Sequence, residues 1–243
     1  MITQRDHTVN ANLLLASASP RRRELIKLLG RPVETTAADI DETPREREAA
    51  SDLVLRLSRE KAESVASSLI LHPSSFILPP SAFILIASDT TVALEGEPLG
   101  KPIDAADARS MLRRLRDRTH QVHTAITLID PAADRACAEL ATSDVRLRAY
   151  SDQEIEDYIA SGDPFDKAGA YAIQHRGFHP VEKFAHCFAN VMGLPVCHVT
   201  RSLRKLGLEP LTDVPAVCQA YLNYQCPVHQ SILTRSTAIE IAS

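Results

Sequence analysis

The segment ASASPRRREL, residues 16–25, combines features of a phosphate-binding site. Ser19 and Pro20 are typical of the N-cap and the first position of a helix, so three arginines, 21 to 23, fall in its first turn. Cations are disfavoured there, because the amino end of a helix is the positive end of its dipole. A phosphate bound to the backbone N–H groups would reverse that balance, and guanidinium groups suit phosphate oxygens. The alternative is a charged turn exposed to solvent.

Helix geometry gives the three arginines different surroundings. Arg23 shares the outer face of the predicted helix with Lys27, so we expect its side chain in solvent. Arg21 and Arg22 lie above the first apolar residues, at the boundary of the buried stripe. A cleft at this boundary would receive both side chains.

Two acidic residues are candidates for a metal site. Glu42 lies in an acidic loop before a long helix, and Asp89 directly follows the strand predicted for the apolar run before it. A carboxylate at the carboxyl end of a strand lies where open α/β sheets present their ligands. We therefore expect Glu42 and Asp89 to hold a divalent cation, Mg²⁺ or Mn²⁺, with several waters. An acidic residue such as Glu42 more commonly serves only as a charge before the amino end of the following helix, without a metal, and that alternative stays open.

Isolated lysines add positive charge. Lys101 lies in the turn LGKP, Lys167 lies in FDKAGAY, and Lys61 lies on the long helix. Each alone is typical of a solvated surface, but the set is less easily explained so in a protein of net charge −4. His120 and Gln174 complete the candidates. No Ser/His/Asp or Cys/His grouping, GxGxxG or GxxxxGK[ST] is present, so the sequence indicates no nucleophile triad, Rossmann site or P-loop.

The composition predicts one mixed domain. The chain has 243 residues, of which 44% are hydrophobic and 24% charged. Its net charge of −4 and its 5% of aromatic residues argue against a nucleic-acid partner. The amino-terminal segment lacks a signal-peptide pattern, and five cysteines without a CxxC pair indicate reduced thiols in a cytoplasmic protein.

Strands and helices alternate along the chain, with hairpins among them, which indicates an α/β fold with a mixed, twisted sheet flanked by helices. The predicted strands cover residues 13–17, 33–36, 83–89, 120–130 and 136–150, and a hairpin turn is expected near Glu95 and Gly96. One predicted helix ends at Gly30, and a long one places Leu53, Leu57 and Val65 in the core. Further helices are expected over residues 105–115, 152–160, 196–206 and, in the tail, 216–224.

Residues 67–87 read SSLILHP, SSFILPP and SAFILIA, a seven-residue unit repeated nearly three times. Histidine and proline interrupt this run well short of the roughly 20 apolar residues of a membrane span, so no membrane contact is expected. We interpret residues 67–83 as an insertion in a surface connection, within a domain that covers residues 1–209. Residues 210–243 form a C-terminal extension of unknown role.

Five segments resemble the Maf family of nucleotide pyrophosphatases, in this order: ASASPRRREL, ASDTTVALEGEPLGKP, THQVHTAITL, FDKAGAYAIQ and NVMGLPV. The resemblance runs from about residue 13 to residue 208 and is interrupted by the repeat. It implies an ITPase-like fold of two lobes around a deep nucleotide-binding cleft, commonly as a homodimer. It also implies metal-dependent hydrolysis of a nucleoside triphosphate between its α and β phosphates, which gives the monophosphate and pyrophosphate.

The resemblance implies roles for individual residues. Asp89 matches the proton acceptor of the family and Glu42 its acidic partner near the metal, and Lys101 is the third predicted catalytic residue. The positions that match the phosphate site are Ser17, Arg21, Arg22, Lys61, Lys101 and Lys167. Asp166 falls in the same cleft motif.

Three further positions are implied to tune the choice of base. Arg21, Thr90 and Gln174 resemble the branch that acts on dTTP and UTP, with modified pyrimidine nucleotides as further substrates. The branch that acts on 7-methyl-GTP tends to lack this arginine and is the alternative. Ala172 and His175 depart from the family pattern YGIQG beside the expected base pocket.

Ser88 is a further departure from the family pattern, because alanine or glycine is common at the position before the aspartate.

Another class of function also stays open. The resemblance allows a nucleotide-binding regulator of cell division with little turnover. The intact set of Asp89, Glu42 and lysines argues against that alternative, because a pure binder could lose the base and keep the cations.

Overall fold

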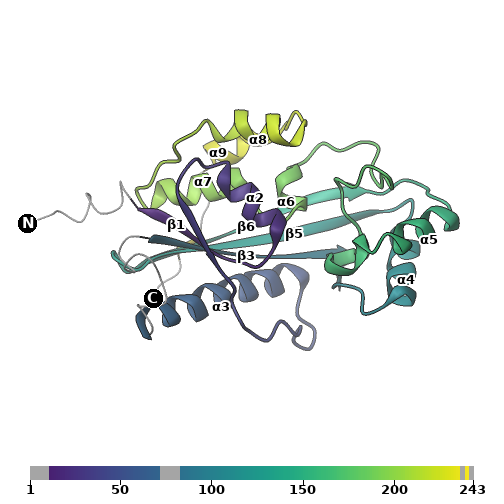
Figure 1. The fold of residues 1–243 in the computed structure, drawn as a ribbon, viewed down its shortest axis with the longest axis horizontal. Helices are drawn as coiled ribbons and strands as arrows, with labels where there is room; N and C mark the ends of the chain where they lie inside the picture. Colours follow the sequence, from purple (N-terminus) through teal and green to yellow (C-terminus); the bar gives the residue numbers. More distant parts are fainter. Residues whose placement is uncertain (1–10, 72–82, 236–238, 241–243) are drawn as a thin grey trace, which may run out of the picture.

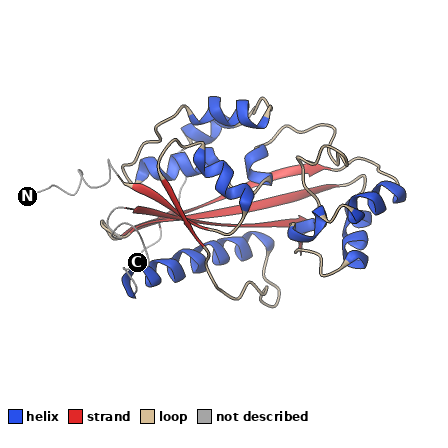
Figure 2. Ribbon diagram, in the orientation of Figure 1, coloured by secondary structure: helices blue, strands red, loops and turns tan. Residues whose placement is uncertain are grey.

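The computed structural model describes residues 11–71, 83–235 and 239–240, and it has one seven-stranded sheet with helices on both faces (Figures 1 and 2). The strand order is β2-β1-β3-β5-β6-β7, and β4 pairs with β3 beside this path. The strands are β1 (Asn12–Ala16), β2 (Val33–Thr36), β3 (Phe83–Leu94), β4 (Glu97–Leu99), β5 (Thr119–Asp130), β6 (Arg135–Arg146) and β7 (Ile239–Glu240). β1 runs parallel to β2 and β3, and the other pairs are antiparallel, which confirms the predicted mixed α/β sheet.

The strand β3 changes partners along its length. On one side it pairs with β1 as far as Ala87, opposite Ala16, and with β4 from Val92, opposite Leu99. Within the part of the chain that the structure describes, residues 88–91 therefore have a strand neighbour only on the other side, where β5 runs along them. The prediction that the strand stops at Asp89 is wrong, because antiparallel pairing with β5 continues well past it. The strand that ends beside Asp89 is its neighbour β1.

Helices cover both faces of the sheet (Figure 1). The long helix α3 (Ala50–Leu71) lies on one face. On the other face lie α2 (Pro20–Lys27), α6 (Phe188–Val191), α7 (Val196–Lys205), α8 (Val214–Leu222) and α9 (His229–Thr234). The helices α4 (Ala105–Leu115) and α5 (Asp152–Ala160) pack together at one end.

The alternation of side chains along the strands explains these layers. On β1, Leu13 and Leu15 join a core with α2, α7 and α8, while Leu14 and Ala16 pack toward α3. Both faces of β1 are buried, as expected for a parallel strand covered twice. A third core joins the far parts of β3 and β5 to α4 and α5, at the end of the sheet that these two helices cover.

Several predicted elements agree closely with the structure. The strand over residues 33–36 and the helices over 105–115 and 152–160 have the predicted bounds. Leu53, Leu57 and Val65 of α3 are buried as expected. The strand β6 ends at Arg146 rather than at Tyr150, because Leu147 bonds to the Arg118 carbonyl outside the ladder.

The structure describes only part of the repeat and part of the C-terminal tail. The first copy of the repeat continues α3 to Leu71, with Leu69 buried, so it is not entirely a surface connection. Residues 72–82 lie outside the described residues, and the last copy supplies the start of β3. In the tail, α8 starts two residues earlier than predicted, and α9 was not predicted. Val214, Cys218 and Ile232 of these two helices join the core beside α2 and α7.

No helix within residues 11–71 or 83–235 combines the length and apolar character needed to cross a membrane.

Candidate active site

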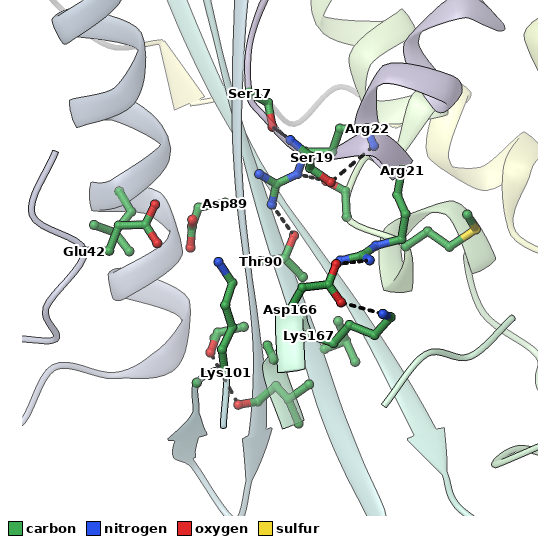
Figure 3. Close-up of a pocket in the computed structure, with 18 of the residues that line it drawn as sticks. Ser17, Ser19, Arg21, Arg22, Glu42, Asp89, Thr90, Lys101, Asp166 and Lys167 are labelled. Carbon is green, nitrogen blue, oxygen red and sulfur yellow. Dashed lines mark hydrogen bonds and ion pairs between the residues drawn. The ribbon is translucent and has the colours of Figure 1, made fainter. Parts of the chain in front are cut away.

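A pocket of about 540 Å³ lies where residues 88–91 of β3 lack a strand neighbour on one side. It brings together all eleven predicted site residues from segments far apart in the sequence, several of which are shown in Figure 3. They are Ser17, Arg21, Arg22, Glu42, Lys61, Asp89, Thr90, Lys101, Asp166, Lys167 and Gln174. Five of them are cationic and three are carboxylates, so the pocket has two excess positive charges in a protein of net charge −4. Such a local field favours an anionic ligand.

The start of α2 forms one wall of the pocket. Ser19 is the N-cap, and its Oγ accepts from the Arg22 backbone N–H at 3.5 Å. Its own N–H donates to the Ser17 Oγ at 3.2 Å, so two hydroxyls and the helix amino end converge there. Arg23 is exposed and does not line the pocket, which confirms the separation of the three arginines.

Arg22 is held by the protein on one side of its guanidinium group. Nε donates to the Gly193 carbonyl at 2.8 Å. Nη2 donates to the Thr90 Oγ1 at 3.0 Å (Figure 3). Burial lowers the pKa of Arg22, while the nearby Asp89 carboxylate acts in the opposite direction. Arginine stays protonated regardless, and no described residue accepts a hydrogen bond from Nη1 or from the second hydrogen of Nη2, so these donors are left for a ligand.

The turn after α6 fixes the carbonyl that receives Arg22. Gly193 has φ +103°, and a Cβ there would lie 3.3 Å from both Arg22 Nε and Thr90 Oγ1. The Ser88 Oγ donates to the same carbonyl at 2.9 Å, and the Thr124 Oγ1 donates to the Asn190 carbonyl at 2.9 Å. The sequence alone assigns no role to Gly193, Ser88, Thr124 or Asn190, although two of them, Asn190 and Gly193, lie in the motif NVMGLPV.

Lys61 on α3 joins the two predicted metal ligands. Its Nζ lies 2.6 Å from the Asp89 Oδ1 and 2.7 Å from the Glu42 Oε1. The side chains of Lys61 and Asp89 are 9% and 10% exposed, whereas that of Glu42 is 51% exposed. Burial alone would raise the pKa of Glu42, but the hydrogen bond and charge of Lys61 outweigh it and lower that pKa, so Glu42 is ionised at neutral pH.

The two carboxylates fit a divalent cation shared with a substrate. Within the described part of the chain no group of three or more His, Cys, Asp or Glu side chains could hold a metal ion. An all-protein cage is therefore not built there, but Mg²⁺ commonly binds through one or two carboxylates together with phosphate oxygens and waters. Glu42 and Asp89 share one ammonium group and so lie close enough to serve one ion.

The opposite wall comes from the segment after α5. The Asp166 Oδ2 accepts from Arg21 Nη1 at 3.0 Å, and its Oδ1 pairs with Lys167 (Figure 3). Burial opposes ionisation of Asp166, but Lys167 and Arg21 together lower its pKa. Lys167 also pairs with the Asp163 Oδ1 at 3.0 Å. One carboxylate thus contacts two of the predicted phosphate-binding residues, Arg21 from α2 and Lys167 from its own segment.

The three positions expected to tune base choice all line the pocket. The Thr90 hydroxyl contacts Arg22 rather than Arg21, while Arg21 pairs with Asp166. The exposed Gln174 makes no hydrogen bond with any described residue, so its carboxamide can turn to a ligand. Ala172 lines the pocket beside it.

His120, the remaining candidate, is not part of the pocket lining. It is 2% exposed, and its Nε2 shares a 2.7 Å hydrogen bond with the Tyr171 hydroxyl. Burial lowers the pKa of His120 to about 4, so its ring is neutral at physiological pH. It is a core histidine.

Comparisons with known proteins agree with this geometry. A family model described as Maf-like protein matches residues 12–206. The dTTP/UTP pyrophosphatase of Myxococcus xanthus (strain DK1622) is 46% identical over 196 residues, covering 81% of this chain and 93% of that protein. Those of Chromobacterium violaceum (44% over 205 residues, 83% and 98% covered) and Geotalea uraniireducens (41% over 197 residues, 81% and 96% covered) are similar too. The solved structure of the Staphylococcus aureus Ham1 protein aligns at a TM-score of 0.41 and 15% identity over 87% of this chain and 98% of that one, too distant to support a conclusion.

Proposed function

The chain belongs to the family of Maf-like proteins, and on that basis we propose that it hydrolyses dTTP and UTP to the monophosphate and pyrophosphate. Curated relatives at 41–46% identity carry the name dTTP/UTP pyrophosphatase. The observation that supports the proposal most is the buried pair of Lys61 and Asp89 at the floor of a pocket with excess positive charge. A triphosphate carries the charge that this pocket lacks.

Asp89 is the proposed general base. One of its oxygens is held by Lys61, and the other makes no hydrogen bond with the part of the chain that the structure describes. That second oxygen is available to take a proton from a water that attacks phosphorus. A carboxylate whose orientation is fixed by a buried partner contributes to catalysis through position as well as basicity.

The cations stabilise the charge that develops on the phosphate oxygens. Arg22 is pre-oriented by Gly193 and Thr90, so it loses little freedom when a phosphate binds. Lys101 is exposed, lines the pocket, and forms no hydrogen bond with a described residue, which leaves its ammonium group for the substrate. Fixed charges of this kind supply most of the rate in phosphoryl transfer.

Glu42 and the Asp89 oxygen that contacts Lys61 would hold the divalent cation, Mg²⁺ or Mn²⁺, which leaves the other Asp89 oxygen for the proton. Bound there, it would neutralise negative charge on the phosphate oxygens. Glu42 is the more exposed ligand and lies on the loop between β2 and α3, so it is reached from the mouth of the pocket.

The base is proposed to bind near Arg21, Thr90 and Gln174. A carboxamide can donate to and accept from the edge of thymine or uracil, which present both an N–H group and carbonyl oxygens. The homodimeric state and a cytoplasmic location are further proposals, drawn from the family resemblance and from the cysteine pattern.

A substrate panel tests the activity. Pyrophosphate release is measured with dTTP, UTP, CTP, modified pyrimidine triphosphates and 7-methyl-GTP, with Mg²⁺, with Mn²⁺ and with a chelator. The expected result is metal-dependent release that is fastest with dTTP and UTP. A preference for 7-methyl-GTP would overturn the choice of base, and tight nucleotide binding without release would favour a regulator with little turnover.

A further inference from the structure

The loop that carries Glu42 has little structure of its own. Residues 37–49, between β2 and α3, form no helix or strand and are mostly exposed. Few hydrogen bonds join residues within the loop; one runs from the Thr43 N–H to the Asp41 Oδ1 at 2.9 Å. Such a loop orders a carboxylate only if something outside it fixes the backbone, because ordering each residue costs conformational entropy.

Arg56, on α3, contacts this loop at two points, Glu48 near its end and Thr43 in its middle. Its Nε and Nη2 donate to the two oxygens of Glu48 at 2.6 and 2.7 Å, which is a bidentate pair. Nη2 also donates to the carbonyl of Thr43, the residue after Glu42, at 3.1 Å. Nη1 donates to Glu60 on the same helix at 3.0 Å, which fixes the direction of the guanidinium plane.

Burial and charge favour a stable contact. The side chains of Arg56 and Glu48 are 13% and 9% exposed, much less than an ordinary surface ion pair. The hydrogen bond from Arg56 is the main cause that lowers the pKa of Glu48 to about 2. Glu48 in turn accepts from the Arg45 backbone N–H at 2.9 Å, so one carboxylate bonds to the helix and to the loop.

Lys61 is on the same helix, five residues after Arg56. It contacts the Glu42 carboxylate itself, while Arg56 contacts the backbone next to Glu42. The helix thereby determines both the position of the loop and the direction of this side chain.

We propose that Arg56 is a positioning residue for Glu42, and that its bonds to Glu48 and Thr43 set the affinity of the site for its divalent cation. This inference rests on the proposed function, since Glu42 is a metal ligand only there. Arg56 does not line the pocket, so it acts through the loop and not on the substrate. Loss of a residue that orients a metal ligand typically costs 10- to 100-fold in metal affinity or activity.

The test uses the full-length protein with Arg56→Gln and Arg56→Lys. Lysine keeps the charge but loses the planar fork of donors, so both variants are expected to weaken the contacts of residue 56 with Glu48 and Thr43. Arg59→Gln is the matched control, because Arg59 is exposed on the same helix and its side chain makes no hydrogen bond with a described residue. Circular dichroism shows whether each variant is folded, and Arg56→Lys serves if Arg56→Gln does not fold.

Two measurements decide. The first is hydrogen exchange of the backbone amides of residues 41–49 without metal or nucleotide, expected to be at least 10-fold faster in the Arg56 variants and unchanged in the control. The second is the Mg²⁺ concentration that gives half-maximal pyrophosphate release, expected to rise about 10- to 100-fold. In a Glu42→Gln background the Arg56 substitution is expected to add less than twofold, because its target is already gone.

Unchanged exchange of the loop, an unchanged Mg²⁺ midpoint, or a full additional effect in the Glu42→Gln background would each overturn the inference. A wild-type protein that releases no pyrophosphate would overturn the proposed function instead. In that case the exchange measurement still decides whether Arg56 holds the loop, because it needs neither metal nor substrate.

Discussion

Asp89→Asn is the substitution that most directly tests the proposed chemistry. It keeps the shape of the side chain and an oxygen that can accept from Lys61, but it removes the negative charge and the basic site. Loss of a general base typically lowers turnover 10²- to 10⁴-fold, or about 3–5 kcal/mol of activation free energy. The expected kcat of the variant on dTTP is lower by that factor.

The structure also limits how much stability the substitution removes. Leaving a buried charge without any partner costs about 3–5 kcal/mol. Lys61 keeps its contact with Glu42 at 2.7 Å, and that carboxylate is half-exposed, so the loss of unfolding free energy should be smaller, about 1–2 kcal/mol. For a chain of this length the melting temperature would fall by only a few degrees.

The assay measures pyrophosphate release at 25 °C and the melting temperature of the same samples. Asp144→Asn is the control, because it makes the same aspartate-to-asparagine change at an exposed position of β6. The Asp144 Oδ1 accepts a hydrogen bond from Gln121 at 3.3 Å. The control should keep wild-type turnover. Turnover of Asp89→Asn within threefold of wild type would refute the assignment of Asp89 as the base.

Three other substitutions follow from the structure. Arg22→Lys should raise the KM for dTTP at least 10-fold, because one ammonium nitrogen cannot replace the separate Nε and Nη2 that bond to Gly193 and Thr90 and also bind a phosphate, whereas Arg23→Lys should leave it unchanged; equal effects would contradict the geometry. Gly193→Ala should cost about 1–3 kcal/mol of unfolding free energy and most of the activity, because its φ of +103° strains an alanine and the added Cβ crowds Arg22; full activity would show that the turn adapts. His120 has a folded pKa of about 4 against an ordinary value of 6.5, so the unfolded chain binds its proton first as pH falls, and about 3 kcal/mol of stability should be lost between pH 6.5 and 4. Denaturant titrations between pH 6.5 and 4 should show an unfolding free energy that depends less on pH in His120→Phe. An unchanged pH dependence would show that His120 does not cause the loss.

Local signals in the sequence explain which elements could be predicted. The helix α2 begins at Pro20 because Ser19 caps it, and α5 begins at Asp152 because Ser151 and Glu154 form a capping box. These interactions join residues at most three positions apart, so the residues needed to predict them are neighbours in the sequence. The same holds for the hairpin turn at Glu95 and Gly96.

What the sequence did not predict depends on contacts between distant residues. The continuation of β3 past Asp89 follows from its pairing with β5, and no local feature of ASDTTV specifies that partner. The bond from Arg22 to the Gly193 carbonyl joins residues 171 positions apart. The family resemblance identified which side chains gather in the pocket, but it did not indicate what holds them, as with Arg56 and the loop of Glu42.

Residues 88–91 of β3, between its partners β1 and β4, leave a short edge of the sheet open beside the pocket. Backbone groups on an unpaired strand edge invite pairing with other chains, and proteins usually shield them. Here the unpaired stretch is only residues 88–91, bounded by paired segments at both ends. A foreign strand would have to displace β1 or β4 to add itself, so this edge is open to a small molecule yet closed to aggregation.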